Sequence, residues 1–215
     1  VHPEDEKLGC GGTLLKHAQE GEDLYWIIVT KPTLDHWSSE VILEKDQEVK
    51  NVARAFGMKE TIRLSFKSVQ LDYGVMADLM AQIYDALLEI KPEIVYNING
   101  GDVNSDHQIV HAAVMAVLKP FQMGKLGVNR ILSFETISST DASAPGLRQA
   151  FNPTVFSDIT DFIDSKIAIL ELYQSVIHQY PYPRSSDSVR ALSRYRGSII
   201  AVPYAEAFMV CREII

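Results

Sequence analysis

The stretch VHPEDE places one histidine and three acidic side chains next to one another. Neither the period of a helix face nor that of a strand explains this spacing, and Pro3 fixes one backbone angle, so we expect a shaped turn. In such a turn His2 and Asp5 can converge on one point. An imidazole nitrogen and a carboxylate oxygen are donors that suit zinc and similar divalent metals, so the turn predicts two metal ligands.

A second polar segment, NINGGDVNSDH, ends at a histidine that can supply a third donor, His107. A catalytic zinc normally takes three protein ligands and keeps one position open for water. The bound metal lowers the pKa of that water from ~16 toward ~7, and a nearby carboxylate can take its proton. Glu4 is the candidate base, and Asp106 can orient a histidine ligand from outside the site.

Each of these residues also has a simpler explanation. A histidine in the position of His2 is usually exposed to solvent, and Asp106 can be a helix N-terminal charge that the macrodipole favours. His111, one helical turn after His107, is better explained by packing or by a surface hydrogen bond. The glycines of GCGG lack both common phosphate-binding spacings. From the residues alone, a metal-dependent hydrolase is about as well supported as a protein in which these residues form no metal site.

Composition narrows the class of protein. The 215 residues are 47% hydrophobic and 22% charged, which suits one domain over residues 1–215. A net charge of -8 argues against a nucleic-acid partner, because phosphates attract basic surfaces. Only Cys10 and Cys211 are cysteines, which favours a reduced, cytoplasmic protein, and we expect no membrane span.

Strand-like and helix-like segments alternate along the chain, which predicts an α/β fold: a Rossmann-like, mostly parallel sheet flanked by helices. The expected strands are 24–30, 62–66, 93–98 and 131–137, and the expected helices are 13–20, 40–56, 74–90, 107–118, 158–178 and 188–196. Ligands bind such sheets beyond the carboxyl ends of the strands. Segment 138–153 is expected to be a loop, either a substrate wall or an exposed connection.

The combination of HPEDE, GCGGTL and the later DVNSDH resembles the PIG-L/LmbE-like family of zinc-dependent de-N-acetylases. The segments ARAFG, PRSSDSVRALSRYRG and YAEAF continue the resemblance, which thus covers nearly the whole chain. Members of the family place a hydrophobic parallel strand directly before the first motif. The resemblance therefore implies that a first strand is missing from these 215 residues.

The resemblance implies a zinc site with His2, Asp5 and His107 as ligands. It also implies that Glu4 is the general base, although the family normally has aspartate at this position. The additional methylene moves the carboxylate oxygens, and a misplacement of ~1 Å can cost ~100-fold in rate. Asp106 would assist beside His107.

Other positions depart from the common family forms. Asn104 stands where some members carry a histidine proposed as an acid, and asparagine cannot supply a proton. Lys45 stands where an arginine often reaches toward the substrate. With Asp102, these two are the expected substrate contacts. Arg184 and Glu206 are further candidates, for which a surface residue and a structural cap are equally good explanations.

These inferences predict a zinc-dependent hydrolase that removes an acetyl group from the nitrogen of an amino-sugar-containing substrate. One alternative is a zinc amidase acting on a thiol conjugate or an acylated peptide. Another is a carbohydrate-binding relative without activity, in which Glu4 and Asn104 mark a weakened site. The expected partner is an N-acetylated amino sugar or its conjugate, with a homo-oligomer possible.

Overall fold

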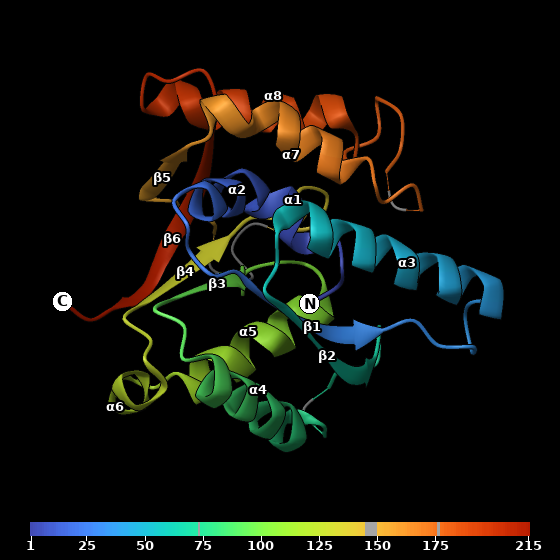
Figure 1. Cartoon of the computed structure of the whole chain (residues 1–215), viewed down its shortest axis with the longest axis vertical. Coiled ribbons are helices and arrows are strands. Elements are labelled where there is room, and N and C mark those ends of the chain that lie inside the picture. Colours follow the sequence, from blue (N-terminus) through green and yellow to red (C-terminus); the bar gives the residue numbers. More distant parts are fainter. Residues whose placement is uncertain (73, 145–149, 176) are drawn as a thin grey trace.

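The computed structural model describes residues 1–72, 74–144, 150–175 and 177–215, in which helices cover both sides of a central layer of strands (Figure 1). The elements in chain order are α1 (Asp5–Gly9), α2 (Gly11–Gln19), β1 (Tyr25–Lys31), α3 (Ser39–Phe56), β2 (Glu60–Lys67), α4 (Met76–Ile90), β3 (Ile94–Ile98), α5 (Ser105–Val117), α6 (Pro120–Met123), η1 (Gly124–Leu126), β4 (Arg130–Phe134), β5 (Val155–Asp158), η2 (Thr160–Phe162), α7 (Ile163–Leu170), α8 (Ser186–Ile199) and β6 (Ala205–Glu213).

The strands form two sheets. β1 and β2 pair in parallel, with Ile27 opposite Ile62. The second sheet has the order β3-β4-β6-β5, in which β3 and β4 are parallel and β6 runs antiparallel to both of its neighbours. The predicted α/β fold is thus confirmed, although the second sheet is mixed because the unpredicted strand β6 reverses direction.

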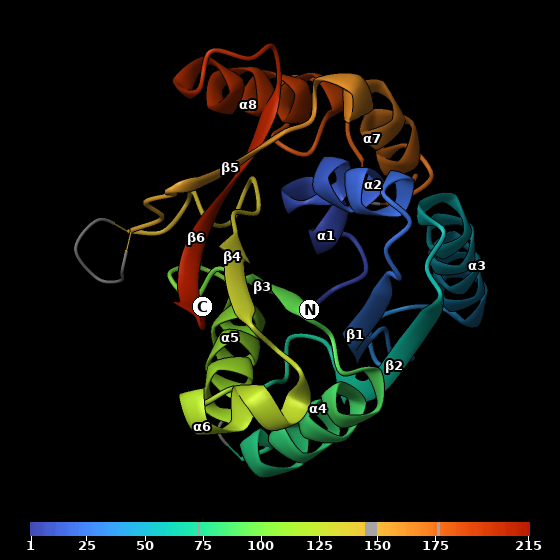
Figure 2. The same cartoon turned by 60° about the vertical axis from the view of Figure 1, so that its left-hand side comes forward.

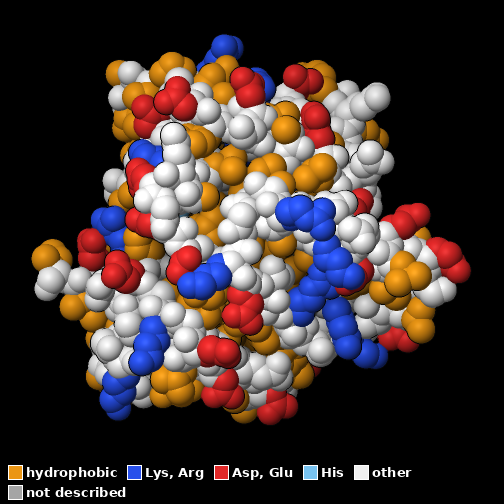
Figure 3. Space-filling view, in the orientation of Figure 1, with side chains coloured by type: hydrophobic (Ala, Val, Ile, Leu, Met, Phe, Trp, Pro, Cys, Tyr) orange, Lys and Arg blue, Asp and Glu red, His pale blue; other side chains and the backbone are white. Residues whose placement is uncertain are grey.

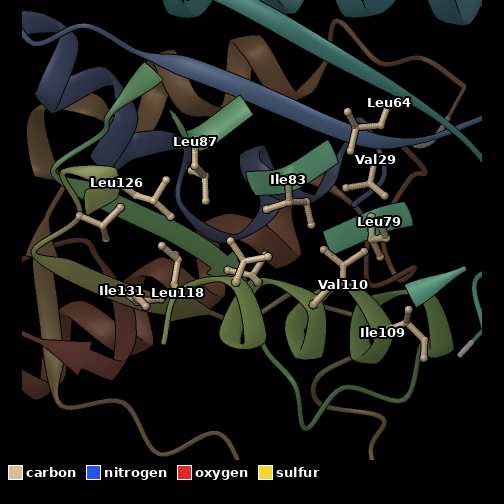
Figure 4. Packing of buried hydrophobic residues seen from close by; sticks show 14 of the residues in the cluster. Val29, Leu64, Leu79, Ile83, Leu87, Ile109, Val110, Leu118, Leu126 and Ile131 are labelled. Atoms are coloured by element: carbon tan, nitrogen blue, oxygen red, sulfur yellow. The ribbon is translucent and has the colours of Figure 1, made fainter. Parts of the chain in front are cut away.

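Helices α4, α5 and α6 lie on one side of the strands, and the remaining helices lie on the other (Figures 1 and 2). Leu79, Ile83 and Leu87 follow one another at four-residue intervals along α4, so they form one face, and all three are buried. They pack with Val110 of α5 and Ile131 of β4 (Figure 4). Burying each such side chain contributes roughly 1.5–3 kcal/mol to the stability of the fold. This packing holds α5 and the loop before it against the sheet.

No ladder joins the two sheets among the described residues. Instead, β1 and β3 line a cavity of about 580 Å³. The carbonyl of Val1 reaches β1, where it accepts from the backbone N–H groups of Val29 and Thr30, each at 3.2 Å. That a parallel strand precedes the first motif stays a prediction.

The predicted helix over residues 158–178 is wrong. Asp158 ends β5, and its carboxylate accepts hydrogen bonds from the backbone N–H and the hydroxyl of Thr160, at 2.9 and 2.6 Å. A short 3₁₀ turn and α7 follow, and α7 ends at Leu170. Ile159, Ile163, Ile167 and Leu170 share one buried cluster, but the chain reaches that cluster through a strand, a turn and a short helix.

Residues 138–144 and 150–153 contain neither a helix nor a strand, in agreement with the predicted loop, and 145–149 lie outside the described residues. The glycines of GCGG lie at the end of α1 and at the start of α2, which are separated by Cys10. Gly9 is needed for close packing, because a Cβ there would lie 2.1 Å from the ring of Phe134.

The surface carries acidic and basic side chains interspersed over the face in Figure 3. On α3 and β2, for example, Asp46 pairs with both Lys50 and Arg63. Within the described part of the chain, every helix is too short or too polar to cross a bilayer.

Candidate metal centre

Three predicted ligands meet where α1 and α5 begin. His2 precedes α1, Asp5 is the first residue of α1, and His107 lies in the first turn of α5. The His2 Nδ1 atom is 3.2 Å from His107 Nε2. Asp5 Oδ2 is 3.5 Å from the same His2 nitrogen and 3.3 Å from the same His107 nitrogen. The three atoms form a nearly equilateral triangle.

This triangle fits a metal ion. Zinc ligands at about 2.0–2.1 Å in tetrahedral directions lie roughly 3.3 Å from one another, which is the spacing of the three atoms. The second carboxylate oxygen of Asp5 is buried without a hydrogen-bond partner among the described residues. Two imidazoles and one carboxylate are also the donor set of catalytic zinc sites, so the chemistry and the spacing agree.

Asp106 orients His2. Its Oδ2 lies 3.0 Å from His2 Nε2, and its two oxygens also accept from the backbone N–H groups of Val69, at 2.7 Å, and Leu71, at 3.3 Å. Asp106 contacts His2 of the first motif rather than the adjacent His107, because adjacent residues at a helix start point in different directions. Because Asp106 contacts Nε2, the imidazole of His2 is held with Nδ1 pointing toward the other two ligands.

Asp102 orients His107, its Oδ2 lying 3.1 Å from His107 Nδ1. The same oxygen accepts from the hydroxyls of Ser139, at 2.8 Å, and Thr140, at 2.9 Å. Asp102 is 0% exposed, and a contact between Asp102 and the substrate stays a prediction. Its two hydroxyl partners lie more than thirty residues further along the chain, and no local sequence signal indicated them.

Asn104 is the N-cap of α5. Its side-chain oxygen accepts from the backbone N–H groups of Asp106, at 2.9 Å, and His107, at 3.4 Å. The sequence carries this signal, because asparagine is a preferred N-cap residue. The cap holds the start of the helix that presents His107, while a substrate contact through the remaining amide hydrogens stays a prediction.

Glu4, which precedes Asp5 in the sequence, forms an ion pair with Arg184, with Nη1 3.2 Å from Oε1. Lys45 instead donates to Ser175, at 3.2 Å, and lies over the ring of Trp37. Its predicted role toward the substrate stays a prediction. His111 contacts the carbonyl of Ile98 at 2.8 Å, as expected of a packing residue.

The acidic neighbours raise the pKa of both histidines in the absence of a metal. Burial lowers the pKa of His2, but hydrogen bonds with Asp106 and Asp5 outweigh this effect and raise the pKa to about 9. Burial also lowers the pKa of His107, but the charge of Asp5 and the hydrogen bond with Asp102 raise it above its usual value. A metal ion can use these nitrogens only after their protons leave.

Metal affinity is therefore expected to rise with pH. Below pH 9, each bound ion must displace at least the proton of His2, so the apparent affinity should increase by at least ~10-fold per pH unit between pH 6 and 8. Competition titrations with a chromogenic chelator at three pH values measure this. Asp106→Asn, which removes one of the hydrogen bonds that raise the pKa of His2, should show a shallower slope. A pH-independent affinity in the parent protein would contradict this assignment.

Glu206 lies in a buried polar network away from these residues. Its carboxylate accepts from the backbone N–H groups of Gly12, at 2.8 Å, and Thr13, at 2.7 Å, at the start of α2. Lys166 Nζ lies 2.6 Å away, and both side chains are 2% exposed. Of the two explanations for Glu206, the structure shows the structural cap.

Glu206→Ala is expected to destabilise the fold by about 3–5 kcal/mol, because it leaves the ammonium of Lys166 buried without its counter-ion. Glu213→Ala on the same strand is the matched control. Glu213 pairs with Arg130 where both side chains are 36% exposed, so its loss should cost at most ~1 kcal/mol. Urea unfolding measures the free energy of unfolding of both variants. Equal losses of stability in the two variants would show that burial of the ion pair does not determine the cost of removing it.

Comparison with known proteins gives a consistent result. A family model described as PIG-L: GlcNAc-PI de-N-acetylase matches residues 1–118, more than half of the chain. The uncharacterized deacetylase YaiS of Escherichia coli (strain K12) is 26% identical over 180 residues, which cover 81% of this chain and 88% of that protein. Diacetylchitobiose deacetylase of Thermococcus kodakarensis is 23% identical over 213 residues, covering 95% and 78%.

A solved structure has the same fold. The conserved protein TT1542 from Thermus thermophilus superposes with a TM-score of 0.78 at 23% identity, over 100% of this chain and 93% of that chain.

Proposed function

The chain belongs to the PIG-L family, described as GlcNAc-PI de-N-acetylase, and on that premise we propose that it is a zinc-dependent hydrolase that removes the acetyl group from an N-acetylated amino sugar or its conjugate. The relatives named as deacetylases support an enzyme acting on N-acetyl groups. The observation that carries the proposal is the triangle of His2, Asp5 and His107, with Glu4 between the first two of these ligands in the sequence.

In this mechanism His2, Asp5 and His107 hold the zinc ion. When bound, zinc polarises the acetyl carbonyl, makes water acidic and stabilises the negative charge that develops on the carbonyl oxygen. Asp106 and Asp102 fix the orientation of the imidazole rings of His2 and His107.

Glu4 moves the proton. Its carboxylate takes a proton from the attacking water as the oxygen adds to the acetyl carbon, and it returns that proton to the nitrogen as the carbon–nitrogen bond breaks. The products are acetate and a free amine. Asn104 cannot supply the proton, since an amide does not ionise at neutral pH, so a single carboxylate serves both steps.

The two cysteines, Cys10 and Cys211, are both free thiols, which supports a proposed cytoplasmic location.

An acetate-release assay tests the proposed reaction. The zinc-loaded protein is incubated with N-acetylated monosaccharides, disaccharides, nucleotide sugars and glycolipid fragments, and with an acylated peptide and an N-acetylated thiol conjugate as the competing class. Acetate release confined to the amino sugars supports the proposal. Acetate release from the peptide or the thiol conjugate alone would show that the protein is an amidase of that other class. No release from any of these compounds by the zinc-loaded protein would overturn the proposed activity.

A further inference from the structure

Arg184 connects three segments that lie far apart in the sequence. It precedes Ser185, the N-cap of α8, and its Nη1 lies 3.2 Å from Oε1 of Glu4, 180 residues earlier. Its Nε donates to Ser138 Oγ at 2.9 Å. The side chains of the ion pair are 22% and 16% exposed, so the guanidinium lies in a partly enclosed position where it is only partly screened by solvent.

We propose that Arg184 is a positioning residue that holds the carboxylate of Glu4 in the orientation required for proton transfer. The proposal rests on the proposed function, in which Glu4 is the base. It assigns Arg184 to Glu4 rather than to the substrate.

The length of glutamate supplies the physical reason. Glu4 has one more rotatable bond than aspartate, and it makes no capping hydrogen bond to its own helix α1. Without a partner, its carboxylate would sample several rotamers, of which few place an oxygen beside the attacking water. The arginine fixes Oε1 and leaves Oε2 available to accept a proton. Because a misplacement of ~1 Å can cost ~100-fold, one fixed rotamer has a large effect on rate.

The second hydrogen bond of Arg184 fixes the arginine itself. Ser138 has a φ of 76°, in the left-handed region, and lies in a turn whose next residues, Ser139 and Thr140, donate to Asp102. Asp102 in turn contacts His107. The base and the third metal ligand are therefore tied to the same turn, so the guanidinium places Glu4 relative to the metal centre.

Arg184→Gln should lower kcat by about 10–100-fold while KM and the bound metal per chain change by less than ~2-fold. Arg184→Lys keeps the charge but cannot bridge two partners, so it should recover only part of the loss. Arg190→Gln is the matched control, because Arg190 of α8 pairs with Asp164 of α7 in an exposed position, and it should leave kcat unchanged. A rise in KM at constant kcat would make Arg184 a substrate contact and overturn the proposal.

A double-mutant cycle with Glu4→Asp tests whether Arg184 affects kcat through Glu4. An aspartate carboxylate ends about 1.5 Å short of the glutamate position and cannot keep the contact with Nη1. In the Glu4→Asp background, Arg184→Gln should therefore change kcat by less than ~3-fold. A full 10–100-fold loss in both backgrounds would mean that Arg184 acts independently of Glu4.

Thermal unfolding tests the contact between Glu4 and Arg184 without requiring enzymatic activity. The combined drop in Tm for Glu4→Ala and Arg184→Gln should be smaller than the sum of the single drops by about 1–3 °C, since both remove the same contact. This coupling is measurable in a protein that releases no acetate. Lack of acetate release would defeat the proposed activity, whereas strictly additive Tm values would defeat the role of Arg184.

Discussion

His107→Ala is expected to abolish stoichiometric metal binding and, with it, acetate release. The substitution removes one corner of the triangle and leaves His2 and Asp5 as two donors, too few to enclose an ion. Loss of a residue that only orients a ligand costs ~10–100-fold in affinity, so loss of the ligand itself should exceed ~100-fold. Competition titration of zinc against a chelator measures this directly.

The control for this variant lies on the same helix. His111→Gln changes a half-buried histidine that contacts a backbone carbonyl rather than the triangle, and it should leave zinc affinity within ~3-fold of the parent. Circular dichroism verifies that both variants fold. A folded His107→Ala protein that retains one tightly bound ion per chain would place the metal elsewhere.

Glu4→Gln is expected to lower kcat by about 100–10,000-fold, the usual contribution of a general base. Glutamine has nearly the same shape and can still accept from Arg184, but it cannot take a proton from water. Because Glu4 is not a corner of the triangle, KM and zinc content should stay within ~2-fold of the parent. Steady-state kinetics with metal analysis on the same sample separates the two effects. Hydrolysis at the parental rate would show that another group is the base.

Local patterns were enough to predict α5, which carries His107, and several elements around the candidate site, whereas α1, which begins at Asp5, was not among the expected helices. The run LYWIIVT and the apolar spacing of α4 have the periods of a buried strand and an amphipathic helix, and β1 and α4 form close to the expected bounds. The first motif and DVNSDH flank the starts of α1 and α5, and the fold brings their three donors together. The predicted family resemblance is confirmed by the match over residues 1–118.

The errors arose where long-range contacts decide the structure. β6 has no alternating pattern, because its first four residues are all buried and two of the later ones are exposed, and only pairing with β4 and β5 defines it as a strand. The contact of Asp102 with His107 was not predicted, since its further partners Ser139 and Thr140 approach it only in the folded chain. The contact between Glu4 and Arg184 spans 180 residues and could not be predicted from spacing.

Zinc titration of the metal-stripped protein, with acetate release as the readout, tests most directly whether the triangle holds the ion that the reaction needs. The substrate is the N-acetylated amino sugar on which the loaded protein is most active. We predict no release from the stripped protein and a linear recovery that reaches its plateau at one zinc ion per chain, with no recovery for His107→Ala. Acetate release that is undiminished by stripping, or a His107→Ala variant that recovers as the parent does, would contradict the account.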